Sequence, residues 1–149
     1  MHFANPWKSY RQIATQTASP GQLVLMLYEG AIRFLERARL GFAKDDPAEC
    51  NETINNNILR AQEIIQELNV SLNVKEGGDV AANLRRLYEY MDWRLMESNL
   101  KKNEEGIQEI IRRLTVLRDA WSSMLQNKGP SASATESADY SRLPELAAA

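Results

Sequence analysis

The chain has 149 residues and carries 18 lysines and arginines against 20 aspartates and glutamates, which gives a formal net charge of −2. This length predicts a single domain, and an apolar content of 44% is enough for a buried core without a disulfide or a structural metal. Because the basic residues are balanced by acids and form no continuous stripe, the sequence argues against a nucleic acid as partner.

Cysteine usage and hydropathy indicate where the protein works. Cys50 is the only cysteine, so no disulfide can form within one chain. The N-terminal region lacks the apolar run after basic residues that is typical of a signal peptide. No stretch approaches the roughly 18 consecutive apolar residues of a membrane-spanning helix. We therefore expect a cytoplasmic protein that is not inserted in a membrane.

The first two predicted helices each begin with a capping residue followed by proline. A Ser-Pro pair predicts a helix over residues 19 to about 43, because serine caps the free backbone N–H groups and proline fits the first turn. An Asp-Pro pair, with Glu49 three residues after the aspartate, predicts a second helix over residues 46 to about 72.

The last two predicted helices are marked by glycines and by a further capping residue. The glycine pair at 77–78 predicts a break in the chain, followed by a third helix over residues 79–102. Asn103 then predicts the start of a fourth helix with two glutamates in its first turn. The pair Gly129-Pro130 predicts its end.

Apolar residues in the last three helices recur at steps of three and four, the spacing of a helical-bundle core. Short connectors make consecutive helices antiparallel neighbours. The fold class is therefore predicted as all-α, an antiparallel four-helix bundle. The predicted core positions are Ile54, Ile58, Ala61, Ile65, Leu68 and Leu72; Val80, Leu84, Leu87, Met91 and Leu95; and Ile107, Ile110, Leu114, Leu117, Trp121 and Met124.

We divide the chain into three parts. Residues 1–18 are predicted to form a short cover segment on the bundle, because they carry a small apolar face of their own. Residues 19–128 form the bundle. Residues 129–149 are rich in serine and alanine without a period, which predicts a disordered tail. The apolar face of the cover segment consists of Phe3, Trp7, Tyr10 and Ile13.

The first predicted helix is apolar over an unusually wide arc. Its apolar residues span roughly 220° of the helix circumference, against about 100° for an ordinary amphipathic helix. Two interpretations remain open: the helix lies centrally in an asymmetric bundle, or it keeps one face for another chain.

The third predicted helix carries a second apolar stripe on the side away from the core positions. Trp93, Met96 and Leu100 step by three and four along this side. An outward tryptophan and methionine indicate a surface that accepts a partner helix. The alternative is that the cover segment lies over the stripe, and the two interpretations are compatible because a partner can displace such a cover.

No residue constellation typical of catalysis or metal binding is present. The single histidine, His2, lies near the N-terminus, and no cluster of Cys, His and Asp has the spacing of a metal site. Cys50 has no histidine to activate it as a nucleophile. The glycine pair at 77–78 lacks the preceding strand of a phosphate-binding loop. We therefore expect a protein that is not an enzyme and has no cofactor and no metal.

Several motifs together resemble the flagellar secretion chaperones for flagellin. The likeness covers roughly residues 8 to 125, and the combination of motifs in this order is highly specific. It departs from the family at Trp93, where many relatives have a polar or basic residue, and in the tail. The motifs are Tyr10, Thr17-Ala18-Ser19-Pro20, LVLMLYEGA at 23–31, AQEII at 61–65, Gly77-Gly78, LYEYM at 87–91 and LRDAW at 117–121.

This resemblance implies a cytoplasmic chaperone that binds the disordered C-terminal segment of flagellin, prevents its premature polymerisation and delivers it to the export gate of the flagellar secretion apparatus. The excess apolar surface then binds the client. We expect the chaperone itself to be a monomer or a weak homodimer. The alternative is a self-associating structural helical-bundle protein. The candidate client contacts are Tyr10, Leu25, Tyr28, Ile32, Leu59, Trp93, Met96 and Leu100.

Overall fold

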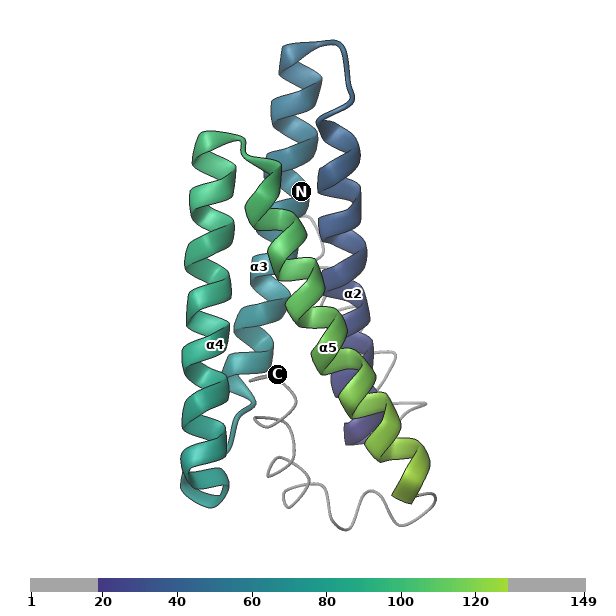
Figure 1. The fold of residues 1–149 in the computed structure, drawn as a ribbon, viewed down its shortest axis with the longest axis vertical. Helices are drawn as coiled ribbons and strands as arrows, with labels where there is room; N and C mark the ends of the chain where they lie inside the picture. Colours follow the sequence, from purple (N-terminus) through teal and green to yellow (C-terminus); the bar gives the residue numbers. More distant parts are fainter. Residues whose placement is uncertain (1–18, 129–149) are drawn as a thin grey trace, which may run out of the picture.

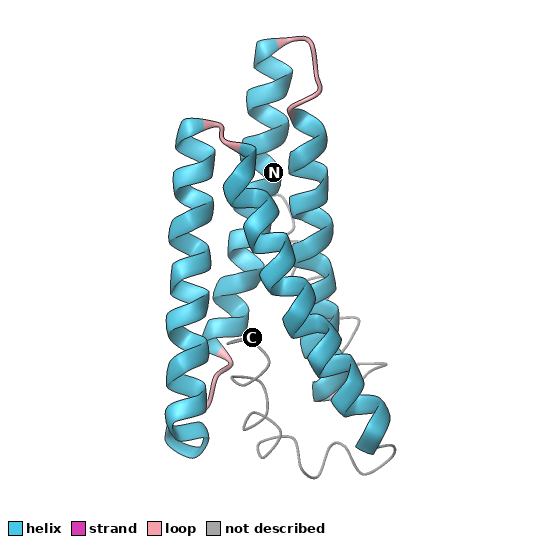
Figure 2. Cartoon of the chain, viewed as in Figure 1, coloured by secondary structure: helices cyan, strands magenta, loops and turns pink. Residues whose placement is uncertain are grey.

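The computed structural model describes residues 19–128, and this part of the chain consists of four long helices without a strand (Figures 1 and 2). The cover segment and the tail predicted at either end lie outside the described residues. The helices are α2 (Pro20–Gly41), α3 (Pro47–Val70), α4 (Val74–Lys101) and α5 (Glu104–Lys128).

The four helices form an antiparallel bundle, as predicted. Helix α2 packs mainly on α3 and α5, and α4 packs mainly on the same two helices. Consequently α2 and α4 lie diagonally opposite each other. Helix α5 crosses the bundle obliquely, from the end of α4 towards the start of α2 (Figure 1).

The capping residues begin three of the helices as the sequence predicts. The Ser19 hydroxyl accepts a hydrogen bond from the backbone N–H of Gln22 at 3.2 Å. The Asp46 carboxylate does the same for the backbone N–H of Glu49 at 3.2 Å. At the start of α5, the Asn103 side chain accepts from a backbone N–H two residues later, at 2.8 Å. Each bond satisfies a donor that the first helical turn leaves unpaired.

The break predicted at the glycine pair is present, and the long body of α4 continues after it from Asp79, as predicted. The prediction missed the short helical turn before the break. This turn begins at Val74, because Asn73 caps it by accepting a hydrogen bond from the backbone N–H of Glu76 at 3.2 Å. Gly78 has φ 56° and ψ −132°, a conformation that side-chain-bearing residues rarely adopt.

The core follows the predicted positions closely. Every predicted core position of the second and fourth helices is buried. In α4 the prediction holds in part: Leu84, Met91 and Leu95 are buried, whereas two other predicted positions, Val80 and Leu87, are only half-buried. The neighbouring Ala81 and Tyr88 are buried in their place.

The wide apolar arc of α2 is divided between the core and its edge. Six residues of the arc are buried, because α3 and α5 cover two adjacent sides of the helix. Four more, Leu23, Val24, Leu25 and Phe34, are half-buried and pack against the core from its edge. The buried residues are Leu27, Tyr28, Ala31, Ile32, Leu35 and Ala38.

Candidate functional site

The largest group of exposed apolar side chains along one face of the bundle belongs to α3 and α4. Trp93, Met96 and Leu100 of α4 are 50%, 47% and 79% exposed, and Leu59 of α3 is 44% exposed. We call these four residues the α3–α4 patch. Tryptophan and methionine are costly to leave in water, so their grouping on one face indicates a binding surface.

Side-chain hydrogen bonds set the register of α3 against α4. The bonded residues step by seven along α3, and their partners step by seven in the opposite direction along α4. This spacing places Leu59 and Met96 at the same level of the helix pair. The pairs are Asn55 with Asn99 at 2.8 Å, Gln62 with the backbone oxygen of Asp92 at 3.2 Å, and Asn69 with Arg85 at 3.2 Å.

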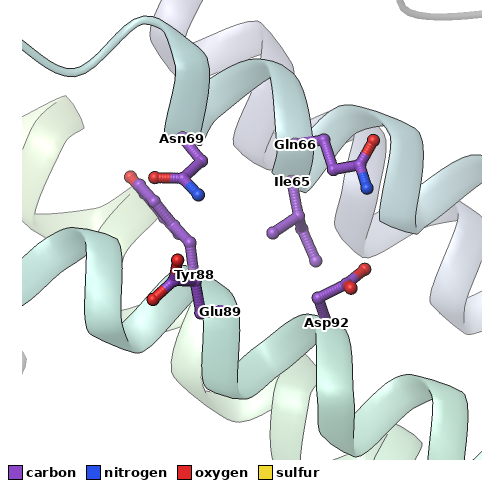
Figure 3. A pocket seen from close by; sticks show the side chains of 6 residues that line it. All are labelled: Ile65, Gln66, Asn69, Tyr88, Glu89 and Asp92. Atoms are coloured by element: carbon purple, nitrogen blue, oxygen red, sulfur yellow. The ribbon is translucent and has the colours of Figure 1, made fainter.

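A depression of about 200 Å³ continues the groove between α3 and α4 from the patch towards the start of α4. Its walls mix polar and apolar side chains, and α3 and α4 each contribute three of them (Figure 3). Burial raises the pKa of Asp92, and a hydrogen bond from Gln62 opposes that change. The lining residues are Ile65, Gln66, Asn69, Tyr88, Glu89 and Asp92.

On the other side of α4, one carboxylate joins this helix to α5. Glu109 of α5 accepts hydrogen bonds from the Tyr90 hydroxyl at 2.7 Å, from Arg113 Nε at 2.9 Å and from Arg94 Nε at 3.0 Å. Burial alone would raise the pKa of Glu109. The three donors outweigh that effect and lower the pKa to about 2, so the group stays ionised at neutral pH.

Tyr90 connects this carboxylate to the patch. Its ring centroid lies 6.0 Å from that of Trp93, with the ring planes tilted by 37°. The guanidinium carbon of Arg113 lies 5.2 Å from the centre of the Tyr90 ring. The exposed tryptophan therefore rests beside a tyrosine that α5 holds at both its hydroxyl and its ring.

The remaining candidate residues do not join the patch. Tyr28 and Ile32 are 1% and 7% exposed, because they belong to the part of α2 that other helices cover. The Tyr28 hydroxyl lies 2.6 Å from that of Tyr88 on α4, in the core. Leu25 is half-buried at the edge of the core. Tyr10 lies outside the described residues.

Sequence reasoning missed Tyr90 of α4 and the two α5 residues, Glu109 and Arg113, that hold it beside Trp93. Tyr90 stands three residues before Trp93, which places the two side chains near each other on any helix. Glu109 and Arg113 likewise form an i,i+4 pair on α5. These local spacings can be recognised in the sequence. The register of α4 against α5, which brings Glu109 to Tyr90, cannot.

The described residues offer little for metal binding or for crossing a membrane. Between residues 19 and 128, no group of three or more His, Cys, Asp or Glu side chains could hold a metal ion. In the same range, none of the helices combines the length and the apolar character needed to span a bilayer. Cys50 is a half-buried free cysteine.

Comparison with known proteins gives a consistent result. A family model described as flagellar protein FliS matches residues 3–128. The flagellar secretion chaperone FliS of Bacillus subtilis is 37% identical over 128 residues, which cover 86% of this chain and 92% of the relative. The proteins of the same name from Salmonella typhimurium and Escherichia coli are 35% and 32% identical, over 92% and 84% of this chain and 99% and 93% of their own lengths.

Proposed function

Since the chain belongs to the FliS family of flagellar secretion chaperones, we propose that its client is flagellin and that it binds the C-terminal segment of this client. The chaperone covers a segment through which flagellin subunits would otherwise associate, and so prevents polymerisation before export. The observation that carries this proposal is the exposed α3–α4 patch, with its tryptophan and methionine, on an otherwise well-packed bundle.

The chemistry of the patch suits an amphipathic helix. Exposed tryptophan and methionine are effective anchors, because one offers a large rigid surface and the other a flexible thioether. A disordered segment that becomes helical on binding spends part of its contact energy on ordering. Such a segment binds firmly over a large surface and can still be released at the export machinery.

We assign the client contacts chiefly to Leu59, Trp93, Met96 and Leu100. Leu25, at the edge of the core, and Tyr10, in the predicted cover segment, are additional contacts in this proposal. A client could touch Tyr28 and Ile32 only if the bundle opened, because both are buried in it.

The proposal also concerns where the chaperone acts. Flagellin is made in the cytoplasm, so the chaperone meets it there and presents it to the export gate of the flagellar secretion apparatus. This role requires binding and release but no catalytic step and no cofactor. The chaperone acts as a monomer or a weak homodimer.

Calorimetric titration of flagellin into the chaperone tests the proposal. Full-length flagellin and its isolated C-terminal segment should bind with similar affinity, and flagellin without that segment should not bind. Equal binding of the truncated flagellin would contradict the assignment of the segment.

Sedimentation of the chaperone alone and with the segment tests the self-associating alternative. The proposal expects a small species that shifts on addition of the segment. A stable oligomer whose sedimentation does not change when the segment is added would support a structural role instead.

A further inference from the structure

Helix α5 contributes no residue to the α3–α4 patch, but the structure points to a role for α5 in client binding there. We infer that Glu109 is a positioning residue for client binding: through Tyr90, it holds the Trp93 indole in the orientation that the client meets. This role rests on the client site proposed above and extends it to a helix on the other side of α4.

The carboxylate of Glu109 is held in one orientation. Its side chain is 20% exposed, and its two oxygens accept three hydrogen bonds from donors on α4 and α5. Arg94 is itself held by a second carboxylate, since its Nη1 donates to Glu97 at 2.8 Å. A carboxylate with charged donors on both oxygens has little freedom to turn.

Tyr90 transmits this constraint to the patch. Its hydroxyl donates to Glu109, and the Arg113 guanidinium lies over its ring. The ring can then neither swing out nor slide along α4. Trp93 lies one helical turn further on and packs against this ring with its own.

The constraint matters because Trp93 is half-exposed. An exposed indole on a single helix exchanges among several rotamers, and binding must select one of them. Immobilising a side chain of this kind costs a complex about two- to tenfold in affinity. A tryptophan already held in one orientation avoids most of that loss.

An ion pair elsewhere on α5 provides a matched comparison. Glu104 accepts a hydrogen bond from Arg39 Nε of α2 at 2.9 Å, so it also joins α5 to a neighbouring helix. It belongs to a different helix pair from Tyr90 and Trp93. Glu104→Gln therefore removes an interhelical charge pair of the same kind without touching the support of the patch.

Fluorine NMR of the full chain labelled with 5-fluorotryptophan tests the positioning directly. The chain has three tryptophans, and the resonance of Trp93 is assigned by its loss in Trp93→Phe. Tyr90→Phe and Glu109→Gln should each shift and narrow the Trp93 resonance, since the indole gains motion beside a freed ring. Glu104→Gln should leave it unchanged. A Trp93 resonance that stays at its native position and width in both test variants overturns the inference.

Titration of a flagellin C-terminal fragment into the same variants completes the test. Tyr90→Phe and Glu109→Gln should bind about two- to tenfold more weakly, and Glu104→Gln should bind as the native chain does. Weak binding by Trp93→Ala together with native binding by both test variants overturns the role of Glu109 alone. Native binding by Trp93→Ala overturns the placement of the client on Trp93 and the role of Glu109 with it. A native chain that binds no flagellin fragment contradicts the proposed function itself, whatever the NMR spectra show.

Discussion

The hydroxyl oxygens of Tyr28 and Tyr88 lie 2.6 Å apart, and each tyrosine is at most 2% exposed. The two residues belong to α2 and α4, the diagonally opposite helices of the bundle. A buried hydroxyl is costly unless it is hydrogen-bonded, so this contact favours one depth and one rotation of α2 relative to α4. This pair therefore ties together two helices that share few other contacts.

Tyr88→Phe should lower the free energy of unfolding by about 1 kcal/mol, because the ring is kept and the buried hydrogen bond to Tyr28 is lost. Urea denaturation of Tyr28→Phe, Tyr88→Phe and the double variant measures the pair. The double variant should lose less than the sum of the two single losses. Strictly additive losses would show that the hydroxyls do not depend on each other.

Trp121→Ala should lower the free energy of unfolding by about 3 to 5 kcal/mol, because a large core side chain leaves a cavity. Trp121 is 1% exposed, and its Nε1 donates to the backbone oxygen of Gly21 at 2.7 Å. Thermal melting measures the loss, and client binding should fail only where the variant unfolds. A variant of native stability would be incompatible with the packing of α5 on α2.

Replacing Trp93 and Met96 together by alanine should weaken the binding of a flagellin C-terminal fragment by about 2 kcal/mol or more, since both side chains are exposed anchors. Calorimetric titration measures the affinity, and the melting temperature should stay near that of the native chain. Leu40→Ala is the matched control, because Leu40 is 69% exposed but lies outside the patch. If the double variant binds as tightly as this control, the client lies elsewhere.

Glu109 should make stability depend on pH in the acid range. Its pKa falls from an ordinary 4.5 to about 2 in the folded chain, so the carboxylate favours folding most when it is ionised. Its contribution is therefore complete above about pH 4.5 and is lost as the pH falls towards 2. Denaturation of the native chain and Glu109→Gln between pH 6 and 2 measures this. The gap in stability should narrow as the pH falls, and a constant gap would contradict the assignment.

Local signals explain what the sequence predicted well. Ser19, Asp46 and Asn103 act on backbone groups within their own helical turn, so their effect does not depend on the rest of the fold. The steps of three and four in α3 and α5 are equally local. Asn73 is a capping residue of the same kind, and recognising it would have predicted the short helical turn before Gly78.

The features that were missed depend on contacts between helices. The wide apolar arc of α2 does not say which part of it neighbouring helices cover, so it does not predict the burial of the candidate client contacts Tyr28 and Ile32. The bond between Glu109 and Tyr90 depends on the register and crossing of α4 and α5, which no pattern within either helix contains. The patch itself was predictable, because Trp93, Met96 and Leu100 lie on the side of α4 away from its own core positions.

The change of chain direction at Gly78 divides α4 into a short leading turn and a long body. The leading turn, residues 74–77, can fray as a unit of its own, because helical geometry is interrupted behind it and its opening need not disturb the core. The α4 residues of the patch begin fifteen positions after Gly78, and Leu59 of α3 lies at the level of Met96. The first turn before Gly78, which follows the buried Leu72, is therefore a favourable place to insert a fluorescent reporter or an affinity tag, away from both the core and the proposed client contacts.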